Sequence, residues 1–204
     1  MFYRNQLALD GHINDVGEYT RINVEKSYRA GIELGAAIQL PLGFAINGNA
    51  TFSQNKVASF TEFIDDWDTW TQTEIEHTNT DLPFSPNVIA GVELSVTPKM
   101  KSEKNETSFA LQFKYVGKQF LDLSADDKTA LDAYSFTNFR LNHTWKPTFA
   151  KEINFIFMVN NIFNQLYESN GWSYKYISGG NTNALVGLYP QAGRNFIVGV
   201  SVGF

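Results

Sequence analysis

The sequence contains no cysteine, which excludes both a disulfide framework and a thiolate metal site. It also lacks the apolar run of about 18 or more residues that a transmembrane helix requires. Lys and Arg number 16 against 21 Asp and Glu, and a net charge of −5 argues against a nucleic-acid partner, which needs clustered basic residues. The amino terminus has no basic start followed by an apolar core, as a secretory signal would. If the protein is exported, we therefore expect this chain to be mature or to be the tail of a longer one.

The sequence does contain segments in which apolar residues alternate with small or polar ones, most clearly residues 195–204. Side chains in a strand point to opposite faces with a period of two, so one face of this segment is apolar and the other small or polar. The apolar positions are Phe196, Val198, Val200, Val202 and Phe204. Outer-membrane barrel strands have this pattern, with lipid outside and a polar lumen inside.

Other segments repeat the alternation and predict an all-β chain of about eight strands with little helix. Most reach the roughly nine to eleven residues that a tilted membrane-spanning strand needs, whereas globular strands have a mode of about five or six. The clearest segments keep charge off the apolar face, where Arg or Lys would cost about 2–4 kcal/mol at the lipid midplane. The predicted strands before the last are Tyr3–Leu9, Tyr28–Leu40, Phe44–Gln54, Val88–Val96, Phe109–Lys118, Thr137–Trp145 and Ile153–Phe163.

The connections between these segments alternate in length, which is an independent argument. Membrane barrels have short periplasmic turns and long extracellular loops. The short connections are residues 41–43, 97–107 and 146–152, and the long, mostly polar ones are residues 11–27, 55–87, 119–134 and 165–192. With the carboxy terminus in the periplasm, all four long connections fall outside the cell. We therefore predict an antiparallel up-and-down transmembrane β-barrel segment.

Five stretches make the sequence similar to a known family. They are Gly11–Arg21, Lys26–Leu34, Asn79–Pro86, Tyr115–Leu121 and Val159–Glu168. Together they resemble the late barrel of TonB-dependent outer-membrane receptors, and the Asn-Ile-Phe-Asn run within the last stretch is the most specific. The resemblance covers essentially the whole chain and implies that residues 1–204 are the C-terminal portion of such a barrel, with no plug domain.

Members of that family import iron chelates, haem, cobalamin or glycans across the outer membrane of Gram-negative bacteria. The resemblance implies four partners: outer-membrane lipid, the missing plug and barrel strands, the inner-membrane TonB complex through that missing part, and the barrel-assembly machinery. The last of these is expected to read the terminal strand through Phe196, Val198, Val200, Val202 and Phe204. Alone, the chain is not expected to transport anything.

Residues 60–77 concentrate acidic residues and tryptophans in one predicted extracellular loop. Aromatic rings could stack on a flat or sugar ligand, and carboxylates could hold a cation or hydroxyls. The candidates are Asp65, Asp66, Trp67, Asp68 and Trp70, with Trp172 in the last loop. The competing interpretation is a solvated loop folded on its own scaffold. The spacing matches no calcium loop, which needs a central glycine and a distal glutamate.

Other aromatic residues have simpler interpretations. Trp172, Tyr174 and Tyr176 alternate as strand residues do, which favours a loop that extends the barrel wall. Three more aromatic residues near strand ends suit an interfacial girdle. They are Tyr28, Tyr115 and Trp145.

Nothing in the sequence indicates an enzyme, a metal site or a cofactor. The three histidines, His12, His77 and His143, have no ligand-like spacing and form no nucleophile arrangement. Glu33 and Glu93 fall on inward faces with several basic residues, which a polar lumen against a plug explains.

Two alternatives remain open from the sequence. Eight strands can close into a complete barrel with a structural or adhesion role, and their interior is just wide enough for side chains to fill. Many inward residues are small, however, and would fill a narrow lumen poorly. A soluble lipocalin-like binder ranks last, because its strands would be shorter.

Overall fold

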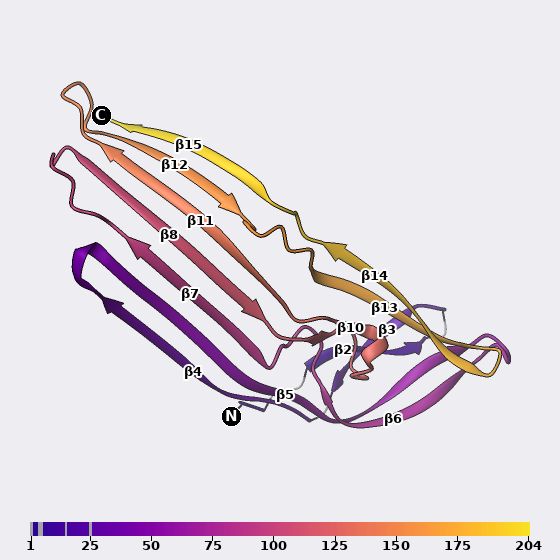
Figure 1. The fold of residues 1–204 in the computed structure, drawn as a ribbon. Helices are drawn as coiled ribbons and strands as arrows, with labels where there is room; N and C mark the ends of the chain where they lie inside the picture. The colour runs from indigo at the N-terminus through magenta and orange to yellow at the C-terminus, as the bar shows by residue number, and fades with distance from the viewer. Residues whose placement is uncertain (1, 4–5, 15, 25) are drawn as a thin grey trace.

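The computed structural model describes residues 2–3, 6–14, 16–24 and 26–204, and nearly all of its regular structure is β-strand (Figure 1). Seven long strands form the body of one antiparallel sheet. They are β4 (Ser27–Gln39), β5 (Phe44–Asp66), β7 (Val88–Val96), β8 (Asn105–Val116), β11 (Tyr134–Trp145), β12 (Glu152–Asn160) and β15 (Asn195–Gly203). They follow one another across the sheet in this order, with the short β1 (Phe2–Tyr3) beside β4. The all-β, up-and-down prediction is confirmed.

The register places side chains of one kind on each face across the whole sheet. One row of neighbouring positions crosses all seven long strands and is apolar throughout. Its members are Ile38, Ile46, Leu94, Leu111, Phe139, Val159 and Phe196. A row on the opposite face is polar and includes Asn47, Glu93, Gln112 and Asn138. Within it, Gln112 donates a hydrogen bond of 2.6 Å to Glu93.

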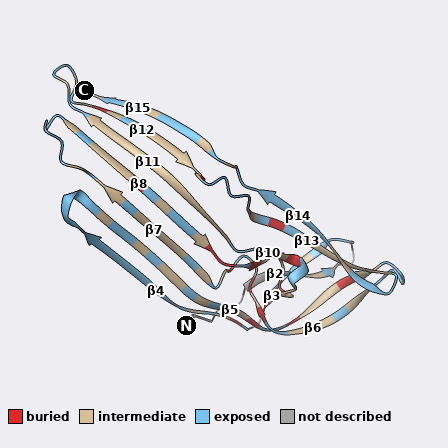
Figure 2. Cartoon of the chain, in the orientation of Figure 1, coloured by how far each residue is buried: buried red, intermediate tan, exposed pale blue. Residues whose placement is uncertain are grey.

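No layer of described residues covers the apolar face. Along the apolar row, 54% of Ile38, 42% of Leu111 and 63% of Phe196 stay exposed. Exposed positions run along β4 and β15, whereas the buried ones gather around β10 and β13 (Figure 2). Soluble monomers rarely expose an apolar surface of this extent, and it marks a face that meets another apolar phase or partner.

The sheet is open at both edges. β15 pairs with β12, and β4 pairs with β5 and β1, but no pairing among the described residues joins β15 to β4 or β1. Closure of a barrel removes such edges, and an unpaired edge strand is a template for another strand. The complete eight-stranded barrel is therefore not favoured.

The first predicted strand, Tyr3–Leu9, is wrong as a single element of the wall. β1 pairs with β4, whereas β2 (Gln6–Ile13) turns away and pairs with β3 (Tyr19–Val24) in a separate two-stranded sheet. The reason is that the predicted long loop folds back and supplies β2 with its own hydrogen-bonding partner.

The ends of the sheet differ in what they carry. The turn end holds short connections, including the 3-10 turn η1 (Pro41–Gly43). At the other end, which we call the loop end, the segments predicted as polar loops contain further strands, so the loop interpretation of them is wrong in part. These elements are β6 (Thr71–Asp81), β9 (Gln119–Phe120), the 3-10 turn η2 (Asp127–Thr129), β10 (Ala130–Leu131), β13 (Glu168–Ser178) and β14 (Asn181–Pro190). No helix among the described residues is long and apolar enough to cross a membrane.

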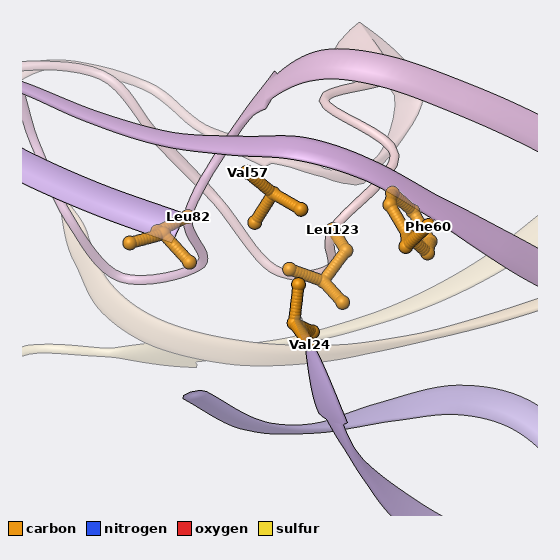
Figure 3. Close-up of a cluster of buried hydrophobic side chains, with 5 residues drawn as sticks. All are labelled: Val24, Val57, Phe60, Leu82 and Leu123. Carbon is orange, nitrogen blue, oxygen red and sulfur yellow. The ribbon is translucent and has the colours of Figure 1, made fainter. Parts of the chain in front are cut away.

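The hydrophobic core also lies at the loop end. Val24, Val57, Phe60, Leu82 and Leu123 form one buried cluster (Figure 3), and each is at most 7% exposed. These residues come from β3, from the outer half of β5 and from the loops that follow β6 and β9. The loop end thus has a packed hydrophobic cluster, whereas the apolar face of the sheet is bare.

Candidate functional site

Two long hairpins project from the loop end and meet at their tips (Figure 1). We call them together the arch: residues 55–81, from β5 and β6, and residues 168–190, from β13 and β14. At the seam β5 and β13 pair in parallel, with Asp65 opposite Tyr176 and Asp66 opposite Ile177. The backbone N–H of Trp67 continues this pairing with a hydrogen bond of 2.9 Å to the carbonyl of Ile177.

Asp68 fastens the two tips to each other. Its carboxylate accepts hydrogen bonds of 2.9 Å from the backbone N–H of Gly179 and 2.8 Å from that of Gly180. Both glycines have left-handed φ angles, 62° and 69°, which residues with a Cβ rarely adopt and which aim the two N–H groups at one acceptor. These bonds from Gly180 and Gly179 lower the pKa of Asp68.

Asp65 links the β2–β3 hairpin to the seam through a hydrogen bond from Tyr19. One of its carboxylate oxygens accepts from the hydroxyls of Tyr19 at 2.6 Å and Tyr174 at 2.7 Å, and the other from the Gln72 amide at 2.8 Å. Burial acts to raise the pKa of Asp65, but the three donors outweigh it and the pKa is lowered. The pKa of Tyr19 is raised, by burial first and then by its bond to Asp65.

The aromatic candidates divide between the seam and solvent. Trp67 stacks on Tyr176 with ring centroids 4.1 Å apart, and the pair covers the seam. Trp70 is 88% exposed at the tip of the β5–β6 hairpin, and Trp172 is 49% exposed on β13. Asp66 caps its own turn, since it accepts from the backbone N–H of Asp68 at 2.9 Å. The structure therefore brings Asp65, Trp67 and Asp68 together and leaves Trp70 and Trp172 apart.

Beneath the arch lies a cavity of about 520 Å³. One wall comes from β5, another from β13, and the rest from the β2–β3 hairpin and two loops. Its aromatic lining residues are Tyr19, Phe60, Phe63, Phe84 and Tyr174. Its charged lining residues are Arg21, Glu62, Asp65, Asp122 and Lys175. A concave site with aromatic walls and a few fixed polar groups is the usual form of a small-molecule pocket.

Lys175 is the centre of a buried polar network in this cavity, and its side chain is only 8% exposed. Its ammonium lies 3.4 Å from Glu62, 4.0 Å from Asp122 and 3.8 Å from Asp126, and it also donates to the hydroxyl of Ser124. A buried ammonium needs such partners, because unpaired charge is costly away from water.

The acidic partners of Lys175 have further donors. Glu62 also contacts His77, with 2.7 Å between the carboxylate and Nε2, and Asp122 accepts from Ser173 at 2.9 Å. Our sequence reasoning missed this network. The available signal was a lysine between Tyr174 and Tyr176 in a strand whose other charged residue is Glu168, but the acidic partners of this lysine are distant in sequence.

The described residues include no group of three or more His, Cys, Asp or Glu placed to hold a metal ion. The three histidines lie apart: His77 stacks on Phe60, His12 meets Phe63 edge-on, and His143 pairs with Thr107 at 2.8 Å.

The terminal strand shows the expected exposure. Phe196, Val198, Val200 and Val202 lie on the bare face of β15, which is at the edge of the sheet and pairs only with β12 among the described residues, and Phe204 follows the end of this strand. The exposed fractions are 63% for Phe196, 75% for Val198, 60% for Val200, 47% for Val202 and 96% for Phe204. Recognition of these residues by the barrel-assembly machinery stays a prediction.

The fold defines a class: an open, curled, partial β-barrel wall with one apolar face, one polar face and a structured loop end. The ferric yersiniabactin uptake receptor FyuA of Yersinia pestis has a similar fold, with a TM-score of 0.56 and 21% identity. So has BauA, the ferric preacinetobactin receptor of Acinetobacter baumannii, with a TM-score of 0.64 and 12% identity.

These similarities cover 89% and 98% of this chain but only 24% and 26% of the two receptors. The chain thus spans about a quarter of the length of the receptors it resembles. No protein-family model matches the sequence, and no curated protein does. The resemblance to TonB-dependent receptors is confirmed at the level of the fold.

Proposed function

We propose that residues 1–204 form the C-terminal portion of the barrel of a TonB-dependent outer-membrane receptor, and that this receptor imports a scarce nutrient. The chain acts there as part of the wall and of the ligand-facing loops, not as an enzyme. The polar face lines the lumen beside a plug that another part of the receptor supplies. Energy from the inner-membrane TonB complex enters through that other part.

The observation that carries this proposal is the open sheet with two chemically different faces. A bare apolar row across seven strands needs lipid, and two unpaired edges need further strands. A closed soluble domain has neither a bare apolar face of this extent nor two unpaired edge strands. Iron chelates are our first choice of substrate, because both similar receptors are named for ferric ligands. Haem, cobalamin and glycans are the other classes.

The orientation follows from the same features. With the turn end in the periplasm, the arch and its cavity face the outside of a Gram-negative cell. Aromatic residues at both ends of the wall then fall at the lipid interfaces. They include Tyr28 and Tyr115 at the loop end and Trp145 at the turn end.

The size of the native polypeptide tests the proposal. An antibody raised against residues 55–87 is used to probe outer-membrane and soluble fractions of the source cells, with antibody absorbed on the same peptide as the control. We expect a membrane band several times larger than the 204-residue chain. A membrane band of the size of the chain itself would point to a stand-alone barrel, and a soluble band would reject the membrane assignment.

A further inference from the structure

We propose that the turn end of the sheet binds the headgroups of anionic phospholipid through five lysines, which we call the lysine rim. They are Lys99, Lys101, Lys104, Lys146 and Lys151. The inference rests on the orientation given under the proposed function, in which the turn end meets the periplasmic leaflet of the outer membrane. It goes beyond that function because it names a class of lipid that the chain selects there.

The fold gathers the lysine rim from two turns, one between β7 and β8 and one between β11 and β12. The backbone N–H of Lys146 donates a hydrogen bond of 2.8 Å to the carbonyl of Lys104, which joins the two turns. The backbone N–H of Lys151 donates to the carbonyl of Gly203 at 2.9 Å. The rim therefore follows the ends of β8, β11, β12 and β15, which are neighbours in the sheet (Figure 1).

The ammonium groups of the lysine rim are available to an anion outside the chain. All five side chains are exposed, and none of them forms an ion pair with a described residue. The same two turns and the strand ends beside them contain three acidic residues, Glu103, Glu106 and Glu152. The turn end is thus richer in basic than in acidic side chains, although the chain as a whole has a net charge of −5.

Two of the three acidic residues lie on the polar face of the sheet, away from the bare apolar face. Glu106 is in register with Thr144, whose hydroxyl donates to the Asn154 side chain at 2.7 Å. The Asn154 amide in turn donates to Glu152 at 3.3 Å. Since side chains two residues apart share a face, Glu152 and Asn154 both belong to this polar row. These carboxylates therefore do not stand between the lysine rim and a membrane.

Aromatic side chains occupy the corresponding end of the apolar face. Trp145 shares that face with Leu141, and its ring meets the ring of Phe149 edge-on with centroids 5.8 Å apart. Phe149 lies in the same turn as Lys146 and Lys151 and is 70% exposed. A tryptophan at the end of a membrane-spanning strand sits at the level of the lipid headgroups. The lysine rim therefore lies at the depth of the lipid phosphates.

This combination favours a lipid surface over a soluble anionic partner. A membrane offers an apolar phase to Trp145 and Phe149 and anionic groups to the adjoining lysines in one surface. The long apolar stems of lysines cover apolar surface while their ammonium groups reach the headgroups. Each lysine near an anionic surface is expected to raise the affinity about fivefold, and salt screens the attraction.

The test uses the full-length native polypeptide, with other cysteines replaced, inserted in vesicles of phosphatidylcholine with a minor share of phosphatidylglycerol. A fluorophore on Thr148→Cys, in the turn after Trp145, is quenched by whichever of the two lipids carries brominated chains. We expect phosphatidylglycerol to exceed its bulk share beside this label about fivefold, the effect of one lysine as a lower bound. Replacement of all five lysines of the rim by glutamine should return it to the bulk share.

The matched control is the Lys118→Gln and Lys128→Gln double variant, which removes two exposed lysines at the loop end and should keep the enrichment. A second measurement needs no variant of the rim: rising salt should reduce the enrichment in the otherwise unmodified receptor. An inserted receptor without enrichment, or an enrichment that is indifferent to salt or to the five substitutions, would overturn the lysine rim and leave the membrane assignment standing. A receptor that does not insert would overturn both.

Discussion

The carboxylate of Asp68 accepts a hydrogen bond of 2.8 Å from the backbone N–H of Gly180, a residue 112 positions further along the chain. Together with the bond from Gly179 to the same carboxylate, this contact joins the tips of two hairpins whose strands are far apart in the sheet. Under it lies the cavity, where the Lys175 ammonium pairs with Glu62 of β5 and with Asp122 of the loop after β9. The loop end is therefore an ordered structure with a seam, and its behaviour can be tested residue by residue.

Charge on the bare face should prevent stable insertion, whereas charge on the polar face should not. Leu111→Arg places a cation in the apolar row, and we expect a loss of about 2–4 kcal/mol of stability in lipid. Ser95→Arg is the control, because Ser95 faces the other side beside Ala110, the neighbour of Leu111. The measurement is unfolding of the full-length receptor in vesicles by denaturant. Equal losses for the two variants would contradict the assignment of faces.

Removal of the buried ammonium should destabilise the loop end. Lys175→Met leaves Glu62, Asp122 and Asp126 without their common cation, and we expect a cost of about 3–5 kcal/mol. Lys118→Met removes an exposed ion pair with Asp127 and should cost about 1 kcal/mol or less. The stabilities of the Lys175→Met and Lys118→Met variants are compared by protease cleavage within residues 119–131 as a function of temperature. Similar cleavage curves would show that the network contributes little.

Acid should open the seam. The pKa of Asp68 is lowered from its ordinary value of 3.8 in the folded protein, so the stabilisation that its carboxylate gives to the joined tips is fully present above that value. The contribution is lost as the pH falls through the lower folded pKa. The pKa of Asp65 is lowered too, so the Asp68→Asn variant should keep a smaller acid response. Spin-label distances between residues 69 and 181 at pH 7 and below pH 3.8 measure this. An acid response that is the same in the unmodified protein and in the Asp68→Asn variant would show that Asp68 is not the group that responds.

Gly11 should be required where the β2–β3 hairpin docks on β5. A Cβ at this position would lie 2.1 Å from the backbone carbonyl oxygen of Phe63, and φ is 91°. Gly11→Ala should thus cost more than the roughly 1–2 kcal/mol of left-handed strain alone. Gly17→Ala isolates that strain, because Gly17 has a φ of 83° and no atoms within 4 Å. Protease susceptibility of residues 6–24 checks the difference, and equal effects would rule out the close approach.

Much of the wall could be predicted from the sequence. Alternation identified the seven long strands and their faces, because each side chain's face depends only on its position in its own strand. The outer half of β5 was assigned to a loop because its residues are polar, yet Val57, Phe60 and Ile64 there are buried. The polar composition of this segment could not indicate that its backbone stays paired with β6, nor that these three side chains pack inward.

The sequence by itself determined the period and the facing of the wall strands, because alternation is a local property of ten or so neighbouring residues. Only the tertiary structure decided that Asp68 meets Gly180, that Lys175 meets Glu62 and that a cavity lies between them. These contacts join residues more than a hundred positions apart, and their partners are chosen by how the hairpins bend over the shorter central strands. No local pattern encodes that geometry.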